Sequence, residues 1–290
     1  MAMGRELKLG RDDPPLDLGR PFMPEALAGL SVVRNLDDAD RLRLNQIRAA
    51  SYVHLFDVFE TSLAEAVRAH GAREIDAREI LVPLLRLDAF DHNELFREFQ
   101  RVFTRVFPVT PKLIPRPADF DAALDGASPL ALLVLALHLK LVTQQHYLAC
   151  VRGDETLEPR FVRVLKEHWS VECGAAKSCS SSLAIQQALG DALPGRIPAA
   201  LRDYKRLVFT CDDVLARQTE LDMATLEAAR GSAFPSGDRT ALVQSQIAAH
   251  RKTFLTVGIV NAAFVYAMRS LGPSAPAMLA GVVSALGART

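Results

Sequence analysis

Hydrophobic residues recur at three- and four-residue intervals along most of the chain, which is the spacing of amphipathic α-helices. The first predicted helix begins at residue 37 or 38 and runs to about His70, where Gly71 supplies a stop signal. The second covers residues 75–107, with Pro83 inside it as a kink or restart point. Connections that contain proline or glycine separate the remaining predicted helices, which cover residues 128–152, 159–189, 199–230, 238–271 and 276–286. The pattern predicts an all-α helical bundle.

The segments near the two ends of the chain determine the domain organisation that we expect. Residues 1–38 contain four prolines and little periodicity, so we expect an N-terminal arm followed by one helical domain over residues 39–290. The opening MAMGRELKLGRDDPP lacks the apolar region of a signal peptide. The longest apolar run, TFLTVGIVNAAFVYAM at 253–268, is shorter than the ~20 residues of a membrane-spanning helix and contains Asn261. This run therefore predicts a buried core helix.

The amino-acid composition excludes some classes of binding partner and of metal or redox site. Of the 290 residues, 49% are hydrophobic and 23% are charged, as in ordinary globular domains. Lys plus Arg and Asp plus Glu both total 34, so the chain lacks the positive excess of nucleic-acid-binding proteins. Its four cysteines, at 150, 173, 179 and 211, form no Cys-x-x-Cys pair, which argues against a structural zinc site or a redox dithiol. We expect a cytoplasmic protein with reduced cysteines, and neither nucleic acid nor membrane as a partner.

Ionisable residues interrupt the apolar stripes of four predicted helices near their middles. They are Glu60 on the first helix, His92 on the second, Lys140 on the third, and His168 with Glu172 on the fourth. An isolated buried charge costs several kcal/mol even after relaxation of the protein around it. We therefore expect these groups to meet one another, or a metal ion, in one dry pocket between the four helices. Helical bundles that hold carboxylate-bridged metal pairs are built in this way.

Five segments carry a resemblance to a known family. They are RLRLNQIRAASYVHLFDVFE (41–60), FDHNELFREF (90–99), HLKLVTQQHYL (138–148), HWSVECGAAK (168–177) and QTELDMATL (218–226). In order and spacing these segments resemble the ferritin-like di-iron p-aminobenzoate N-oxygenases and their bacterial relatives, over residues 20–270. The resemblance implies a ferritin-like four-helix bundle core with additional C-terminal helices. It also implies oxygenase chemistry on small amino or aromatic metabolites.

The resemblance further implies a ligand set of Glu, Glu-x-x-His, Glu and His-x-x-x-Glu-x-x-His on four successive core helices. Four of these ligands are present and are our candidate metal ligands: Glu60, His92, His168 and Glu172. At the other three positions the expected ligand is replaced: Ala89 for Glu, Lys140 for Glu and Ala175 for His. The fourth helix thus keeps the pattern of a metal-binding helix but lacks its last ligand. Asp88 could supply the carboxylate that Ala89 lacks after a small rotation of the helix.

Charge counting bears on how many metal ions this set can hold. Two carboxylates and the Lys140 ammonium sum to −1, so one added proton balances the pocket without metal. One divalent ion would leave +1 and two would leave +3, which a buried pocket should not tolerate. Lys140 is therefore expected to stand in for one metal, with at most one iron or manganese ion per chain. A metal-free alternative stays open, in which Lys140 pairs with Glu60 and Glu172.

These residues predict a homologue of the di-iron oxygenases with a remodelled core site. Such a protein would be a mononuclear-metal or metal-free oxidase or oxygenase that acts on a small organic molecule. Lys140, as a charge or as a general base, and Tyr147, as a redox-active group beside the site, are the candidate catalytic residues. The alternative is a catalytically inactive helical scaffold or partner subunit. A homodimer is compatible with either interpretation.

Overall fold

The computed structural model describes residues 15–31, 33, 36–73, 75–85, 91–190 and 195–289. Within the helices, the side chains of residues 75–77, 79, 83, 91, 92 and 181–190 lie outside the description. The described residues form helices joined by turns and loops and contain no strand, which confirms the all-α class. None of the helices in these ranges combines the length and the hydropathy needed to cross a membrane.

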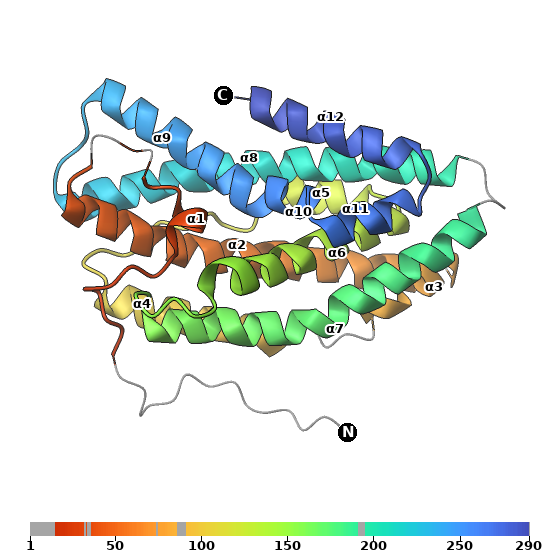
Figure 1. Ribbon diagram of the computed structural model, residues 1–290, viewed down its shortest axis with the longest axis horizontal. Coiled ribbons are helices and arrows are strands. Elements are labelled where there is room, and N and C mark those ends of the chain that lie inside the picture. The colour runs from red at the N-terminus through yellow and green to blue at the C-terminus, as the bar shows by residue number, and fades with distance from the viewer. Residues whose placement is uncertain are drawn as a thin grey trace.

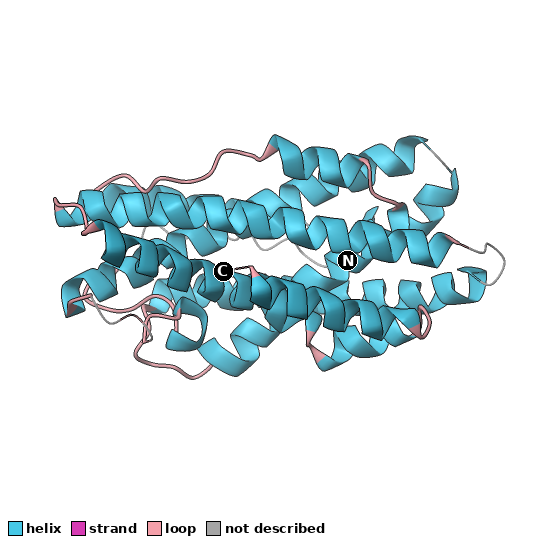
Figure 2. Cartoon of the chain, turned by 90° about the horizontal axis from the view of Figure 1, so that it is seen from above, coloured by secondary structure: helices cyan, strands magenta, loops and turns pink. Residues whose placement is uncertain are grey.

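Long helices run side by side along the longest axis of the molecule (Figure 1; Figure 2 from above). The four that matter most for the site are α2 (Asp38–Arg73), α4 (Asp91–Val106), α6 (Pro129–His146) and α7 (Pro159–Gly190). Two further long helices are α8 (Arg196–Arg230), which packs on α2, and α9 (Ser236–Arg251), which packs on α8. The other helices are α1 (Glu25–Ala28), α3 (Ile75–Leu85), α5 (Ala118–Asp125), α10 (Val257–Ile259), α11 (Ala262–Arg269) and α12 (Ser274–Ala288).

Helix α6 lies in the interior and is buried on almost every side. It opens with Pro129, a residue favoured in the first turn because its missing N–H would have no helical partner there. From Leu130 to Thr143 every residue is buried, and the helix contacts α2, α3, α7 and α8. A helix that is apolar all round needs such surroundings. The polar side chains that α6 does carry, among them Lys140, therefore point into the protein core.

The N-terminal arm packs against the bundle wherever it is described. Its backbone is held by polar side chains of α2: Asn45 Oδ1 accepts hydrogen bonds from the N–H groups of Phe22 (2.7 Å) and Met23 (2.9 Å). Gln46 Nε2 donates to the carbonyls of Leu18 and Arg20. The arm also contains the short helix α1, which the sequence pattern did not predict.

The predicted helix over 238–271 is wrong as a single element. Helix α9 ends at Arg251 and continues as a π-helical segment, η2 (Lys252–Thr256), and then as α10. A break follows, because the Asn261 side chain accepts hydrogen bonds from the N–H groups of Ala263 and Phe264 and so starts α11. Asparagine is a preferred N-cap residue, and this signal lay within the apolar run.

Two other predicted boundaries also differ. The predicted helix over 128–152 ends as an α-helix at His146 and continues as a second π-helical segment, η1 (Tyr147–Val151). The predicted helix over 75–107 corresponds to α3 and α4, with residues 86–90 between them outside the described ranges.

Candidate metal centre

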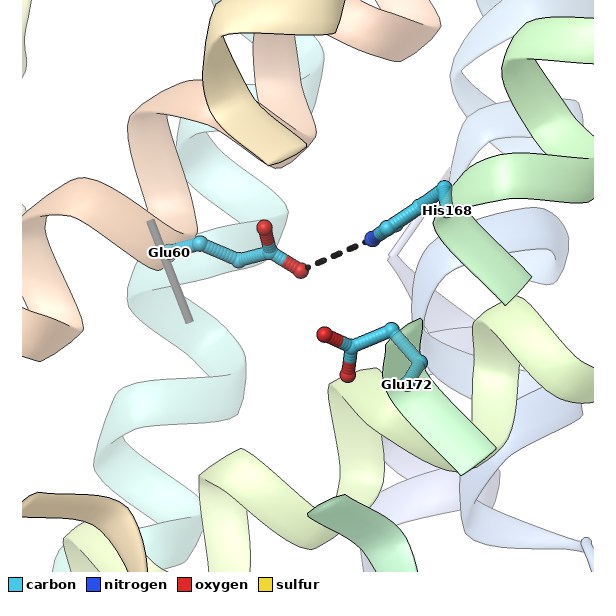
Figure 3. A group of neighbouring side chains, drawn as sticks. All are labelled: Glu60, His168 and Glu172. Carbon is cyan, nitrogen blue, oxygen red and sulfur yellow. Dashed lines mark hydrogen bonds and ion pairs between the residues drawn. The ribbon is translucent and has the colours of Figure 1, made fainter. Parts of the chain in front are cut away.

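Three of the predicted ligands meet between two helices. Glu60 projects from α2, and His168 and Glu172 project from α7 toward it (Figure 3). His168 Nε2 lies 3.2 Å from Glu60 Oε1, and one ligand atom from each residue can be chosen so that all three lie within 4.8 Å of one another. All three side chains are buried. Their spacing explains the grouping, because residues four apart on α7 share one face of the helix.

Aromatic rings separate this group from solvent. The rings of Phe56 on α2 and Phe96 on α4 contact the His168 imidazole edge-on, with centroids 5.2 Å and 4.7 Å away. Phe56 also packs on Phe254 of η2 at 5.1 Å. In so apolar a setting each interaction between charges is stronger than in water, and each charge needs a partner.

Lys140 supplies the positive charge. Its Nζ donates a hydrogen bond of 2.7 Å to Glu172 Oε2, and both side chains are buried. Burial alone would lower the pKa of Lys140, but the carboxylates of Glu172 and Glu60 outweigh it and hold the pKa above its usual value. The ammonium is therefore kept at neutral pH. The retained charge argues against Lys140 as a general base and favours an electrostatic role for it.

Several predicted positions fall outside the described part of the chain. The backbone of His92 lies at the start of α4, but its side chain is not described, so its role as a ligand stays a prediction. Asp88 and Ala89 lie between α3 and α4, in the stretch 86–90 outside the described residues. Ala175 is described and is buried on α7, one turn beyond Glu172. A methyl group there offers no metal ligand.

Tyr147 lies in η1, directly after α6. Its ring stacks on that of Trp169 on α7, with centroids 4.8 Å apart. It therefore packs against the residue that follows His168 in the chain, and its catalytic role stays a prediction.

A second tyrosine forms a polar pair that the residue pattern did not reveal. Tyr52, two turns before Glu60 on α2, shares a 2.8 Å hydrogen bond between its hydroxyl and His146 Nδ1. Burial, and secondarily the charge of Glu60, raises the pKa of Tyr52 well above its usual value. Burial lowers the pKa of His146 to about 3. At neutral pH the pair is thus a protonated phenol and a neutral imidazole. The i, i+4 register Tyr52–Phe56–Glu60 places this tyrosine on the same face of α2 as Glu60, and this register is the signal in the sequence that links it to the site.

The donor set can be tested against the metal content that the resemblance implies. Two carboxylates and an imidazole suit one iron or manganese ion, and Glu60, His168 and Glu172 offer them from atoms within 4.8 Å. Two ions do not fit the described residues, because α6 places an ammonium against Glu172 and α7 places a methyl group at Ala175. Lys140 in place of a glutamate and Ala175 in place of a histidine remove two ligands, and Lys140 also adds a positive charge that repels a second metal ion.

No family model, no curated protein and no solved structure matches the chain at a significant level. The resemblance to a particular family therefore rests on the five sequence segments alone.

Proposed function

We propose that Glu60, His168 and Glu172 bind one divalent iron or manganese ion in a remodelled ferritin-like bundle, and that the protein is an oxidase or oxygenase of a small organic molecule. The observation that carries this proposal is the convergence of two carboxylates and an imidazole within 4.8 Å in a buried pocket. The resemblance to di-iron oxygenases supplies the reaction class. Four cysteines without disulfides fit the cytoplasmic location expected for such a protein.

Bound in this pocket, iron or manganese would supply one-electron redox chemistry and open coordination positions. The residues of the chain itself would orient the ligands, balance the charge and exclude water. Lys140 fixes one oxygen of Glu172 by a charge-assisted hydrogen bond and supplies the positive charge that a second metal would otherwise bring. Phe56 and Phe96 exclude water from His168. Tyr52 keeps its hydroxyl proton in its hydrogen bond with His146.

Metal analysis of the purified protein tests the proposal. Protein produced in medium supplemented with iron and manganese should carry about one ion per chain by inductively coupled plasma mass spectrometry. Glu172→Gln should lose the ion, whereas Glu167→Gln, on the same helix and outside the ligand group, should keep it. Wild-type protein that carries none, even after anaerobic reconstitution, would refute the single-metal site.

The same pocket also supports a second candidate function, in which no metal is bound. The Lys140–Glu172 pair and the His168–Glu60 contact already match each carboxylate with a nitrogen. With His168 protonated, two positive and two negative charges balance, and no metal is required. In that case the protein is a helical scaffold or a partner subunit. Absence of metal together with a large loss of stability on breaking the Lys140–Glu172 pair would support this alternative.

A further inference from the structure

A tyrosine and a histidine form a polar pair inside the bundle, close to the candidate metal centre but outside its ligand group. Tyr52 of α2 and His146, the last residue of α6, are each 1% exposed. Tyr52 precedes Glu60 by eight residues on α2, which is about 12 Å along the helix axis. Neither Tyr52 nor His146 belongs to the three residues that can hold a metal ion together. The proposed metal binding therefore leaves this pair unused.

The Tyr52 hydroxyl is the donor in the pair. Its oxygen lies 2.8 Å from His146 Nδ1, and Tyr52 makes no second hydrogen bond within the described ranges. Burial lowers the pKa of His146 to about 3, so the imidazole is neutral and carries one hydrogen. With that hydrogen on Nδ1, the phenolic hydrogen and the lone pair of Nε2 would both lack a partner. With it on Nε2, the phenolic hydrogen is paired and one unpartnered group remains. His146 Nδ1 is therefore a base that faces the phenolic hydrogen.

Packed aromatic rings connect Tyr52 with a candidate ligand. The Phe56 ring, one turn further along α2, has its centroid 4.9 Å from that of Tyr52 and 5.2 Å from that of the His168 imidazole. All three side chains are at most 1% exposed. An electron can tunnel across two such contacts, because tunnelling needs short distances and no bonded path. A proton needs a hydrogen-bonded acceptor, which Tyr52 has in His146.

We propose that Tyr52 is a redox-active residue that gives one electron to the metal ion of the candidate centre while His146 takes its proton. This inference rests on the proposed metal site and extends it. Tyr52 loses one electron and its O–H bond breaks, which leaves a neutral phenoxyl radical. The proton forms a new N–H bond at His146 Nδ1 and makes the imidazole a cation. The electron passes to the metal ion after a peroxide or dioxygen has oxidised that ion, and it lowers the oxidation state of the ion by one.

Burial explains why the electron and the proton leave Tyr52 together. Burial, and secondarily the charge of Glu60, raises the pKa of Tyr52 well above its usual value, so no phenolate is present at neutral pH. Loss of the electron alone would leave a radical cation in the core, and a phenol radical cation is a strong acid. His146 Nδ1 lies at hydrogen-bond distance and accepts the proton. Burial also disfavours the resulting imidazolium, so the proton returns to Tyr52 when the radical regains an electron.

A second buried tyrosine–histidine pair provides an internal control. The Tyr204 hydroxyl lies 2.7 Å from His138 Nδ1, and His138 Nε2 donates to the Phe254 carbonyl. Burial lowers the pKa of His138 to about 4, so this imidazole is neutral and its Nδ1 again accepts from the phenol. The rings of Tyr204 and His138 contact each other and Phe264. Neither of them contacts His168 in the part of the chain that the structure describes, so this pair has a proton acceptor but no ring contact to a candidate ligand.

Rapid-freeze electron paramagnetic resonance on the full chain tests the proposal. Iron(II) is added without oxygen, the iron content is measured, and protein with about one ion per chain is mixed with hydrogen peroxide and frozen. Wild-type protein should give an organic radical signal that narrows when the protein is produced with deuterated tyrosine, which identifies the radical as a tyrosyl. Tyr52→Phe should keep its iron and lose the signal. Tyr204→Phe, the matched control, should keep both.

His146→Asn tests the proton acceptor separately and also decides the question should Tyr52→Phe fail to fold. An asparagine side chain can accept the hydrogen bond, but an amide does not take up a proton at neutral pH, so the radical should be lost while iron stays bound. A tyrosyl signal that is absent from iron-loaded wild-type protein, or that persists in either variant, would overturn the redox role and leave the metal site standing. Wild-type protein that binds no iron would overturn both proposals.

Discussion

Replacing Lys140 with methionine tests the electrostatics of the candidate site most directly. Methionine keeps the length and most of the volume of the side chain but removes the charge, so Glu172 loses its 2.7 Å partner inside the core. Breaking a buried ion pair by deleting one partner costs about 3–5 kcal/mol, because the remaining charge is left uncompensated. We expect Lys140→Met to lower the free energy of unfolding of the metal-free protein by that amount at pH 7.

The measurement is urea denaturation in the presence of a chelator, followed by circular dichroism. Lys166→Met, on the exposed surface of α7, is the matched control and should change the free energy by less than about 0.5 kcal/mol. Lys140→Met combined with Glu172→Leu should recover much of the lost stability, since an apolar pair of similar volume replaces a buried ion pair at little cost. A loss below about 1 kcal/mol for Lys140→Met alone would mean that the ammonium is solvated and that the buried pair is not formed.

Two further substitutions probe the site and its support. Lys140→Glu with Ala175→His restores two of the missing ligands and should raise the metal content from about one ion per chain toward two, as measured by mass spectrometry; an unchanged content would show that these positions do not face the pocket. Gly258→Ala should destabilise the protein by about 1–3 kcal/mol in a urea titration, because a Cβ at Gly258 would overlap the His138 ring. Gly281→Ala, with open space around it, should be neutral or stabilising, and equal effects at the two glycines would contradict the packing argument.

The sequence predicted which faces of α2, α6 and α7 are buried, because each helix repeats its apolar residues every three to four positions. Helical periodicity alone was enough to point Glu60, Lys140 and Glu172 into the core, where the structure has them. It named Glu60 and Glu172 as possible partners of Lys140 and left open which of them pairs with it; the structure pairs Lys140 with Glu172. That choice depends on how far α6 and α7 are rotated and shifted against each other, and a shift of one residue would turn a side chain by about 100°.

Local breaks in the helices were the least predictable part of the fold. Both π-helical segments, η1 and η2, continue directly from α-helices and contain no proline or glycine that would mark the change. Tertiary contacts account for η2: His138 Nε2 donates to the Phe254 carbonyl at 3.1 Å, and Gly258 leaves room for that ring. A histidine 116 residues away in the chain thus stabilises the irregular segment, and no window of local sequence contains both partners.

Buried Arg48 on α2 shows a second limit of the residue pattern. Arg48 lies one helical turn before Tyr52 on the same face of α2, yet arginine in a helix usually marks the exposed side. Its burial becomes understandable only when Asp222 of α8, His250 of α9 and the carbonyl of Leu27 are known to surround it. Three separate segments create that environment, so the periodicity of α2 alone could not predict it.

Stability and metal affinity should respond to Lys140 in opposite directions, because its ammonium and a metal ion compete for the same carboxylate. A dication about 4 Å from an ammonium is repelled by about 8 kcal/mol at an effective dielectric constant of 20. Lys140→Met removes this repulsion while it weakens the metal-free core. The variant should therefore bind manganese more tightly than wild-type protein by isothermal titration calorimetry, and saturating manganese should restore part of its lost stability. If the variant were destabilised but bound manganese no better, Lys140 would be a partner of Glu172 that does not face the ion, and the idea of an ammonium in place of a second metal would fail.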